Sequence, residues 1–218
     1  MRFAIGSRSR RIGRSSRFVA LAALVLGARI APAENLVTNG DFDSSIDGWD
    51  PGTVASFLAE DWQGDPSSGS LRIVNDLAEA SSVQASQCVA LTGTDPLIFS
   101  GALRGALTGD TTTGRVRIGV SWRTAADCDV SSVVGSYLFA VTVDAPVDWT
   151  VAASDPATPP EGAVAADVQL IATKTAAGGS LTADFDAITV PEPTTAASGA
   201  CAFAASLALA RARRRTGA

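Results

Sequence analysis

Alternating apolar and polar positions run through the chain between residues 34 and 190. In the segment Arg115–Arg123, Val116, Ile118, Val120 and Trp122 alternate with polar or small residues. A period of two predicts β-strands with one buried face, and Gly, Pro, Asp and Ser clusters separate them. Ten strands are predicted: Asn35–Asn39, Thr53–Leu58, Ser70–Asn75, Ser82–Leu91, Pro96–Arg104, Arg115–Arg123, Ser136–Val143, Trp149–Ala153, Val164–Lys174 and Ser180–Val190.

Short strands at this spacing favour an all-β, antiparallel β-sandwich over alternating βαβ units. Within that class we expect a jelly roll. Residues 34–190 have about the size of one domain and can bury a normal core. We expect a signal helix before this domain and a short transmembrane helix after it.

Residues 1–33 have the pattern of a signal peptide. Seven arginines precede or flank the apolar run Phe18–Gly27, and Ala31-Pro32-Ala33 places small residues at the positions that a signal peptidase recognises. We expect cleavage after Ala33 and general secretion. The pair Arg10-Arg11 leaves the twin-arginine route as an alternative.

Residues 191–218 combine Pro191-Glu192-Pro193, an apolar run over Ala196–Ala210 and four arginines. The prolines favour an extended segment, and the run is shorter than the roughly 20 residues of a stable span, which indicates a transient anchor. The tail resembles the PEP-CTERM sorting signal of Gram-negative bacteria. That resemblance implies export, cleavage near the motif by an exosortase-like membrane peptidase, and a place at the cell surface or in the exopolysaccharide matrix.

Without these two ends, the remaining domain is strongly acidic. Residues 34–190 contain 6 basic and 21 acidic residues, a net charge of −15. Such a surface repels phosphate backbones and argues against nucleic acid as a partner. It suits a secreted protein or one that collects divalent cations.

Cys88 and Cys128 are the two cysteines of this domain, while Cys201 lies in the tail. An even number in an exported domain predicts a Cys88–Cys128 disulfide. Closing a loop of this length stabilises the fold by roughly 3 to 4 kcal/mol in the chain-entropy model. Two free buried thiols are the alternative.

The two ends of the domain carry a second resemblance. The opening segment Glu34–Asp43, followed by Gly48-Trp49, resembles the start of CenC-type carbohydrate-binding modules, which are galactose-binding-like jelly rolls. The segment Asp184–Val190 is similar to their closing strand, and Ser70–Ile73 to an internal strand. The resemblance implies a non-catalytic module that binds polysaccharide.

The same resemblance implies one structural calcium ion, with Asp43 and Asp186 as its carboxylate ligands. The family usually has Glu where this chain has Asp43, and a second Asp where it has Ala187. Oxygen ligands suit calcium, and the absence of histidine removes the usual zinc ligand. The apolar alternation slips between Phe185 and Ile188, which predicts a β-bulge at Asp186. Turn residues or solvated charges are the alternative interpretation.

Modules of this kind usually stack aromatic rings on sugars. Trp49, Trp122 and Trp149 are expected in the core. Trp62 lies in the polar segment 60–66 and is the predicted ligand platform, although it could instead cover the end of the sandwich.

A second candidate surface is the polar face opposite Trp122. Arg117 and Arg123 lie on it, and Gln84 joins them if its strand is a neighbour. An ordinary solvated sheet face is the alternative.

The chain offers no signature of catalysis: it has no histidine for a Ser-His-Asp arrangement and no glycine-rich phosphate loop after a strand. We expect a non-catalytic exported protein that binds polysaccharide. The alternative is a structural surface or matrix scaffold without a sugar ligand.

Overall fold

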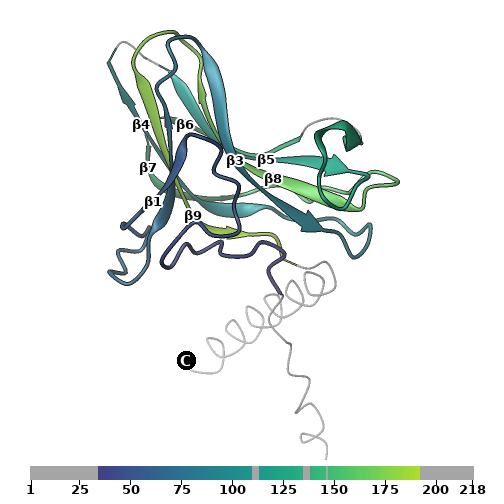
Figure 1. Ribbon diagram of the computed structural model, residues 1–218. Coiled ribbons are helices and arrows are strands. Elements are labelled where there is room, and N and C mark those ends of the chain that lie inside the picture. Colours follow the sequence, from purple (N-terminus) through teal and green to yellow (C-terminus); the bar gives the residue numbers. More distant parts are fainter. Residues whose placement is uncertain (1–33, 110–112, 135–137, 146, 192–218) are drawn as a thin grey trace, which may run out of the picture. The chain divides into compact units, whose positions relative to one another are not determined.

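The computed structural model describes residues 34–109, 113–134, 138–145 and 147–191 (Figure 1). These residues form an all-β, two-sheet antiparallel sandwich, as predicted. No helix among them is long and apolar enough to cross a membrane. The expected signal helix, the transmembrane helix, Glu192 and Pro193 lie outside the described residues. The strands are β1 (Ala55–Leu58), β2 (Ser70–Asn75), β3 (Ser81–Ala90), β4 (Ser100–Thr108), β5 (Gly114–Arg123), β6 (Leu138–Ala145), β7 (Val147–Ala153), β8 (Ala165–Lys174) and β9 (Ser180–Thr189).

One sheet has five strands in the order β1-β2-β9-β4-β7, and the other has four in the order β3-β8-β5-β6. All neighbouring strands are antiparallel. The closing strand β9 lies at the centre of the five-stranded sheet, between β2 and β4 (Figure 1). Residues of β9 therefore pair with residues of β4 and β2 that lie far earlier in the sequence, such as Thr108 with Ser180 and Leu71 with Phe185.

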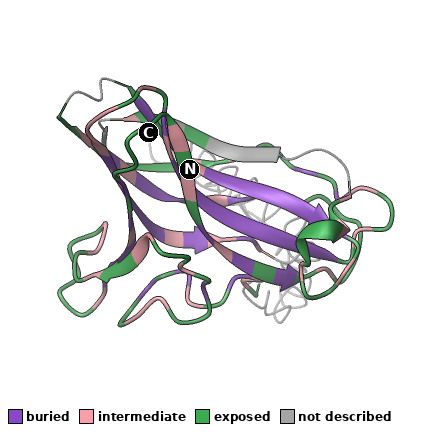
Figure 2. Ribbon diagram, turned by 45° about the horizontal axis from the view of Figure 1, so that its top comes forward, coloured by how far each residue is buried: buried purple, intermediate pink, exposed green. Residues whose placement is uncertain are grey.

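The core lies between the two sheets, and the buried residues lie along their strands (Figure 2). Leu71, Ile73 and Phe185 from one sheet and Val116 and Ile118 from the other are fully buried. Burying each such side chain contributes about 1.5 to 3 kcal/mol. The period-two pattern therefore predicted correctly which face of these strands is inside.

Two of the three tryptophans expected in the core are found there. Trp49 and Trp122 are 5% and 4% exposed. Trp122 meets Phe99 edge to face with ring centroids 6.1 Å apart, and Trp49 tilts against Phe42 at 5.7 Å. Such aromatic pairs add about 0.5 to 1.5 kcal/mol beyond the area that they bury.

The prediction of a strand over Asn35–Asn39 is wrong. Asn35 forms one isolated bridge with Pro191, and the chain then turns because Asn39 and Phe42 adopt left-handed backbone angles, with φ of 51° and 45°. The Asn39 amide donates to the carbonyls of Ser45 and Asp47. Side-chain amides that satisfy nearby backbone groups favour such loops over strands.

The strand predicted over Pro96–Arg104 begins later and runs further, over Ser100–Thr108. Leu97 and Phe99 are buried, as strand residues would be, but Leu97 exchanges hydrogen bonds with Ala157 in an isolated bridge. Residues 96–99 show the apolar pattern of a strand because Leu97 and Phe99 are buried, but they are not part of the sheet.

The predicted bulge at Asp186 is confirmed. Between Ala102 and Ser100, β4 advances two residues while β9 advances three, from Asp186 to Thr189. Ala187 takes up the extra residue with a φ of 49°. Bulges of this kind change the direction of a side chain at the sheet surface.

The predicted disulfide is also confirmed. Cys88 on β3 is bonded to Cys128 in the loop after β5, with Cα atoms 5.8 Å apart. The bond ties this loop to the edge of the four-stranded sheet.

Candidate functional site

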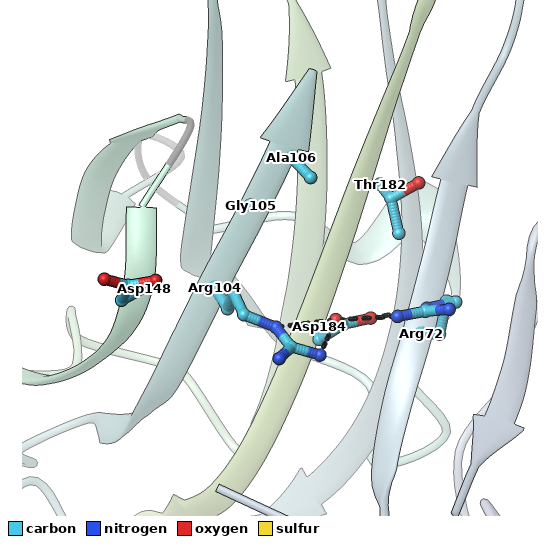
Figure 3. Close-up of a pocket in the computed structure, with 7 residues that line it drawn as sticks. All are labelled: Arg72, Arg104, Gly105, Ala106, Asp148, Thr182 and Asp184. Atoms are coloured by element: carbon cyan, nitrogen blue, oxygen red, sulfur yellow. Dashed lines mark hydrogen bonds and ion pairs between the residues drawn. The ribbon is translucent and has the colours of Figure 1, made fainter. Parts of the chain in front are cut away.

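A pocket of about 470 Å³ opens on the outer face of the five-stranded sheet (Figure 3). Four neighbouring strands, β2, β9, β4 and β7, supply its walls. We call it the arginine pocket, and its lining residues are Arg72, Arg104, Gly105, Ala106, Asp148, Thr182 and Asp184.

Strand register places three of its charged residues in one row. Asp184 is the cross-strand partner of Arg72 on one side and of Arg104 on the other. Figure 3 shows its carboxylate between the two guanidinium groups. Arg72 donates to both carboxylate oxygens at 2.7 and 3.0 Å, and Arg104 donates from Nε and Nη2 to Oδ2 at 3.0 and 2.6 Å.

Glu60 extends this row from the segment that follows β1. Arg104 Nη1 donates to its carboxylate at 2.6 Å. That hydrogen bond holds the pKa of Glu60 below its usual value, and the same contact, with those from Asp184, raises the pKa of Arg104. Arg72 also has a raised pKa because of Asp184. Glu60, Arg72 and Arg104 therefore stay charged near neutral pH.

A bulge brings Asp148 to the pocket and Trp149 to the neighbouring Arg104. Between Leu103 and Gly105, β4 advances two residues while β7 advances three, from Thr150 to Val147. Asp148 and Trp149 therefore both stand opposite Arg104. The Arg104 guanidinium carbon lies 4.6 Å from the centroid of the Trp149 ring, within the range of a cation–π contact.

The arginine pocket thus carries charged hydrogen-bonding groups on a partly exposed surface, and the ring of Trp149 lies next to it against Arg104. Asp184 is 4% exposed, so the centre of the row is rigidly buried. The side chains of Arg72 and Arg104 are 32% and 22% exposed. A polar ligand could reach the guanidinium edges and Asp148, whereas Asp184 holds them in place.

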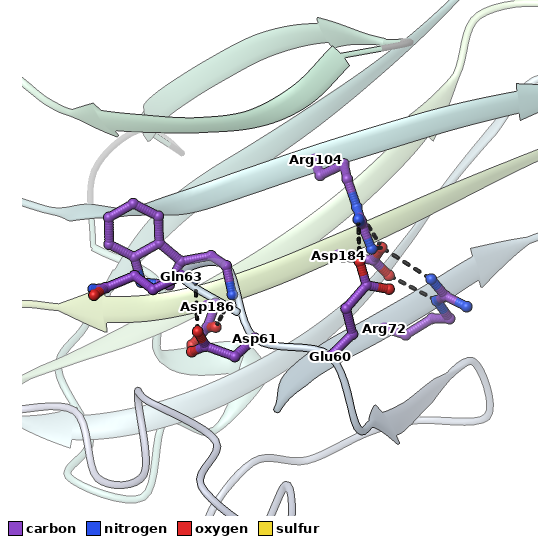
Figure 4. Close-up of polar contacts among 8 residues, drawn as sticks. Glu60, Asp61, Gln63, Arg72, Arg104, Asp184 and Asp186 are labelled. Atoms are coloured by element: carbon purple, nitrogen blue, oxygen red, sulfur yellow. Dashed lines mark hydrogen bonds and ion pairs between the residues drawn. The ribbon is translucent and has the colours of Figure 1, made fainter. Parts of the chain in front are cut away.

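A smaller pocket of about 230 Å³ lies around Asp186, two residues further along β9. Asp186 is 1% exposed, and its two oxygens accept hydrogen bonds from the backbone N–H groups of Trp62 and Ala187 at 3.0 and 2.7 Å. Figure 4 shows Asp186 beside Asp61. Burial raises the pKa of Asp186 to about 7, and the neighbouring Asp61 contributes to this rise. Asp184 and Asp186 share a strand face but have opposite surroundings.

The two residues predicted to bind calcium both line this smaller pocket. Asp43 is exposed and accepts a long hydrogen bond from Ser68 at 3.4 Å. Among the residues that the structure describes, no group of three or more His, Cys, Asp or Glu side chains is placed to hold a metal ion. Asp43 and Asp186 thus line one pocket, and calcium binding stays a prediction.

The segment from Glu60 to Trp62 connects the two pockets. Glu60 accepts a hydrogen bond from Arg104 at the arginine pocket (Figure 4). The backbone N–H of Trp62 donates to Asp186 at the smaller pocket. Trp62 is partly exposed and lines the smaller pocket. The predicted platform is therefore anchored to the sheet by its backbone, on the face that carries the arginine pocket.

The second predicted surface lies on the four-stranded sheet. Gln84 on β3 and Arg117 on β5 both pair with Ile171 on β8, so the three residues form one row. The expected neighbourhood of these strands is confirmed. Gln84 is exposed and Arg117 partly exposed.

Arg123, at the end of β5, is differently placed. It is 5% exposed, and its Nη2 donates to Asp167 at 2.8 Å. Its Nη1 donates to the carbonyls of Asp129 and Val130 at 3.3 and 3.2 Å. Arg123 therefore ties the disulfide loop to the sheet, and both of its terminal guanidinium nitrogens are occupied by these contacts.

Sequence reasoning missed Arg72, Arg104, Asp148 and Asp184 as site residues. It also placed Trp149 in the core, whereas the ring is partly exposed against Arg104. One signal was available, because Arg72 and Arg104 are two of only six basic residues of the domain and both fall on apolar strand segments. Their common row with Asp184 depends on strand order, which the sequence does not show.

Comparison with known proteins supports the fold. No family model and no curated protein matches the chain. Among solved structures it is similar to TmCBM61 in complex with beta-1,4-galactotriose, at 14% identity and a TM-score of 0.50, over 73% of this chain and 99% of that one. It is also similar to the CBM22-1 xylan-binding domain of Paenibacillus barcinonensis Xyn10C, at 16% identity and a TM-score of 0.47, over 74% and 97% of the two chains. The chain therefore has a β-sandwich fold like that of TmCBM61.

Proposed function

We propose that this protein binds polysaccharide in the arginine pocket. The observation that carries the proposal is the row of Arg72, Asp184 and Arg104, which opens to the surface beside the ring of Trp149. Sugar hydroxyls accept hydrogen bonds from guanidinium groups and donate them to carboxylates, and sugar rings stack on aromatic faces. The β-sandwich fold is consistent with this function.

Each group has a distinct role in the proposal. Arg72 and Asp148 hydrogen-bond hydroxyl groups, and Trp149 supplies an apolar contact. Asp184 positions the two arginines, since it is buried between them. Trp62 extends the surface at the end where Glu60 contacts Arg104.

We further propose that binding takes place outside the cytoplasm and without catalysis. The signal peptide, the PEP-CTERM-like tail and the disulfide form one consistent set for an exported protein. Signal peptidase and an exosortase-like peptidase are the proposed processing partners, with the tail inserted transiently in the membrane. The mature protein then belongs to the cell surface or the exopolysaccharide matrix of a Gram-negative bacterium.

A structural calcium ion at the smaller pocket belongs to the same proposal. The buried carboxylate of Asp186 and the nearby Asp43 are oxygen donors of the type that calcium prefers. They would hold the ion, and its charge would offset the burial of Asp186 and the proximity of Asp61. Further oxygen ligands would have to come from backbone carbonyls or water.

A glycan array followed by titration calorimetry tests the function. The purified protein is expected to bind at least one polysaccharide class, and Arg72→Ala should weaken that binding about tenfold, the effect of losing a charge-assisted hydrogen bond. Gln84→Ala on the other sheet is the matched control and should bind normally. Loss of binding in Gln84→Ala alone would move the site to the Gln84–Arg117 surface.

The alternative function is that of a structural scaffold without a sugar ligand. The acidic surface and the disulfide are compatible with it. It predicts no binding on any array and no effect of Arg72→Ala beyond stability. A complete absence of binding would therefore favour the scaffold.

A further inference from the structure

We propose that the arginine pocket selects its polysaccharide by charge, favouring chains that carry ammonium groups over neutral chains and neutral chains over those that carry carboxylates. The chemical class is an amino-sugar polysaccharide with free amines. This inference rests on the proposed function and adds the ligand class to it.

The positive charges of Arg72 and Arg104 are already neutralised by neighbouring carboxylates. Asp184 accepts four hydrogen bonds, two from Arg72 and two from Arg104. Arg104 uses its Nη1 for Glu60 at 2.6 Å. An acidic sugar would have to displace these carboxylates or approach them closely, so the arginines give it little net attraction.

Asp148 is the carboxylate of the pocket that has no counterion. It is exposed, lines the pocket and, among the described residues, has no partner for its side chain. The β7 bulge holds it opposite Arg104. With Arg72 and Arg104 set against Asp148, Asp184 and Glu60, the row carries two positive and three negative charges. A positive group on the ligand is therefore the complement that this surface lacks.

The electrostatic field of the whole domain acts in the same direction. A net charge of −15 over residues 34–190 attracts a polycationic chain and repels a polyanionic one. This long-range contribution is screened within about 8 Å at physiological ionic strength, whereas the contact with Asp148 is local. Added salt should therefore weaken the general attraction to the acidic domain more than the local contact with Asp148.

Three oligosaccharides of equal length test the proposal: oligomers of glucosamine, of N-acetylglucosamine and of galacturonic acid. Affinities are measured by titration calorimetry at about pH 5.5, above the reference pKa values of carboxyl groups, and in about 0.15 M salt. The variants are Asp148→Asn, which removes the charge, and Asp148→Glu, which keeps it. Asp155→Asn is the matched control, because Asp155 is exposed but does not line the pocket.

The glucosamine oligomer is expected to bind most tightly and the galacturonic acid oligomer most weakly. Asp148→Asn should weaken glucosamine binding about three- to fivefold, the range of an exposed ion pair, and leave the N-acetylglucosamine oligomer nearly unchanged. Asp148→Glu should retain most of the preference, and Asp155→Asn should behave as wild type.

Two results would overturn the charge selection while leaving polysaccharide binding intact. One is binding of the neutral or acidic oligomer as tightly as the amine. The other is an equal loss in Asp148→Asn and Asp155→Asn, which would assign the preference to the overall charge. If none of these oligomers binds and the glycan array is also empty, the proposed function itself fails.

Discussion

Both sheets carry paired arginine and aspartate side chains, but the pairs differ in how far they are open to solvent. On the five-stranded sheet, Arg72 and Arg104 flank Asp184 in an open pocket. On the four-stranded sheet, Arg123 and Asp167 form an equally short pair that is closed off, with the two side chains 6% and 11% exposed. The two kinds of Arg–Asp pair therefore differ in whether the guanidinium edges remain accessible.

The difference comes from what lies over each pair. In the loop held by the Cys88–Cys128 disulfide, two backbone carbonyls accept hydrogen bonds from Arg123. These contacts within the protein leave Arg123 little access to a ligand. At the arginine pocket, the segment at Glu60 reaches only one edge of the row. The first arrangement stabilises the fold, and the second leaves donors for a ligand.

The largest expected effect is on the closed pair. Arg123→Ala should lower the free energy of unfolding by about 3 to 5 kcal/mol, because Asp167 is left buried without its counterion. Guanidinium denaturation measures this. Arg115→Ala is the control, because its pair with Asp144 is exposed and contributes about 1 kcal/mol or less. Equal losses in both variants would contradict the contrast between closed and open pairs.

The next effect concerns Asp186 and pH. Its pKa of about 7 in the folded protein lies above the ordinary value, so folding favours the protonated form. This contribution to stability is fully present below about pH 4 and is lost as the pH rises to about 7. Wild type should therefore lose stability relative to Asp186→Asn between these pH values, by up to a few kcal/mol.

Thermal unfolding of both proteins in EDTA at several pH values checks this prediction, and calcium sharpens it. Added calcium should raise the Tm of wild type above pH 7, where Asp186 is charged, and leave Asp186→Asn unchanged. A pH-independent difference between the two proteins would contradict the raised pKa. An equal calcium response in both would remove Asp186 from the proposed metal site.

A smaller effect is expected at Trp149. Trp149→Ala should weaken polysaccharide binding about tenfold, since stacking on an aromatic ring is worth about 1 to 1.5 kcal/mol. Trp122→Phe, in the core, should affect stability but not affinity. Calorimetry on both variants distinguishes the two roles, and normal binding by Trp149→Ala would exclude the ring from the site.

The smallest effect is expected at Trp62, which is anchored through its backbone to Asp186. Trp62→Ala should weaken binding about threefold, because a partly exposed ring at the edge of a site contributes less than one at its centre. A loss larger than that of Trp149→Ala would place the centre of the site at the smaller pocket.

Much of the fold could be predicted from the sequence, since period-two segments such as Val116–Trp122 record which side is buried. The disulfide and the bulge at Asp186 followed from cysteine number and from a slip in that period. The site could not be predicted to the same degree. It needs β9 between β2 and β4, and it needs the bulge that turns Asp148 and Trp149 toward Arg104. Strand order and that bulge leave no local pattern in the chain.

A crystal structure of the protein with the tightest oligosaccharide from the glycan array tests the central claim most directly. The account predicts sugar density between Arg72 and Asp148, with a ring against Trp149 and with the Arg72–Asp184–Arg104 row unchanged. Sugar bound against Gln84 and Arg117 on the opposite sheet, with the arginine pocket empty, would contradict it.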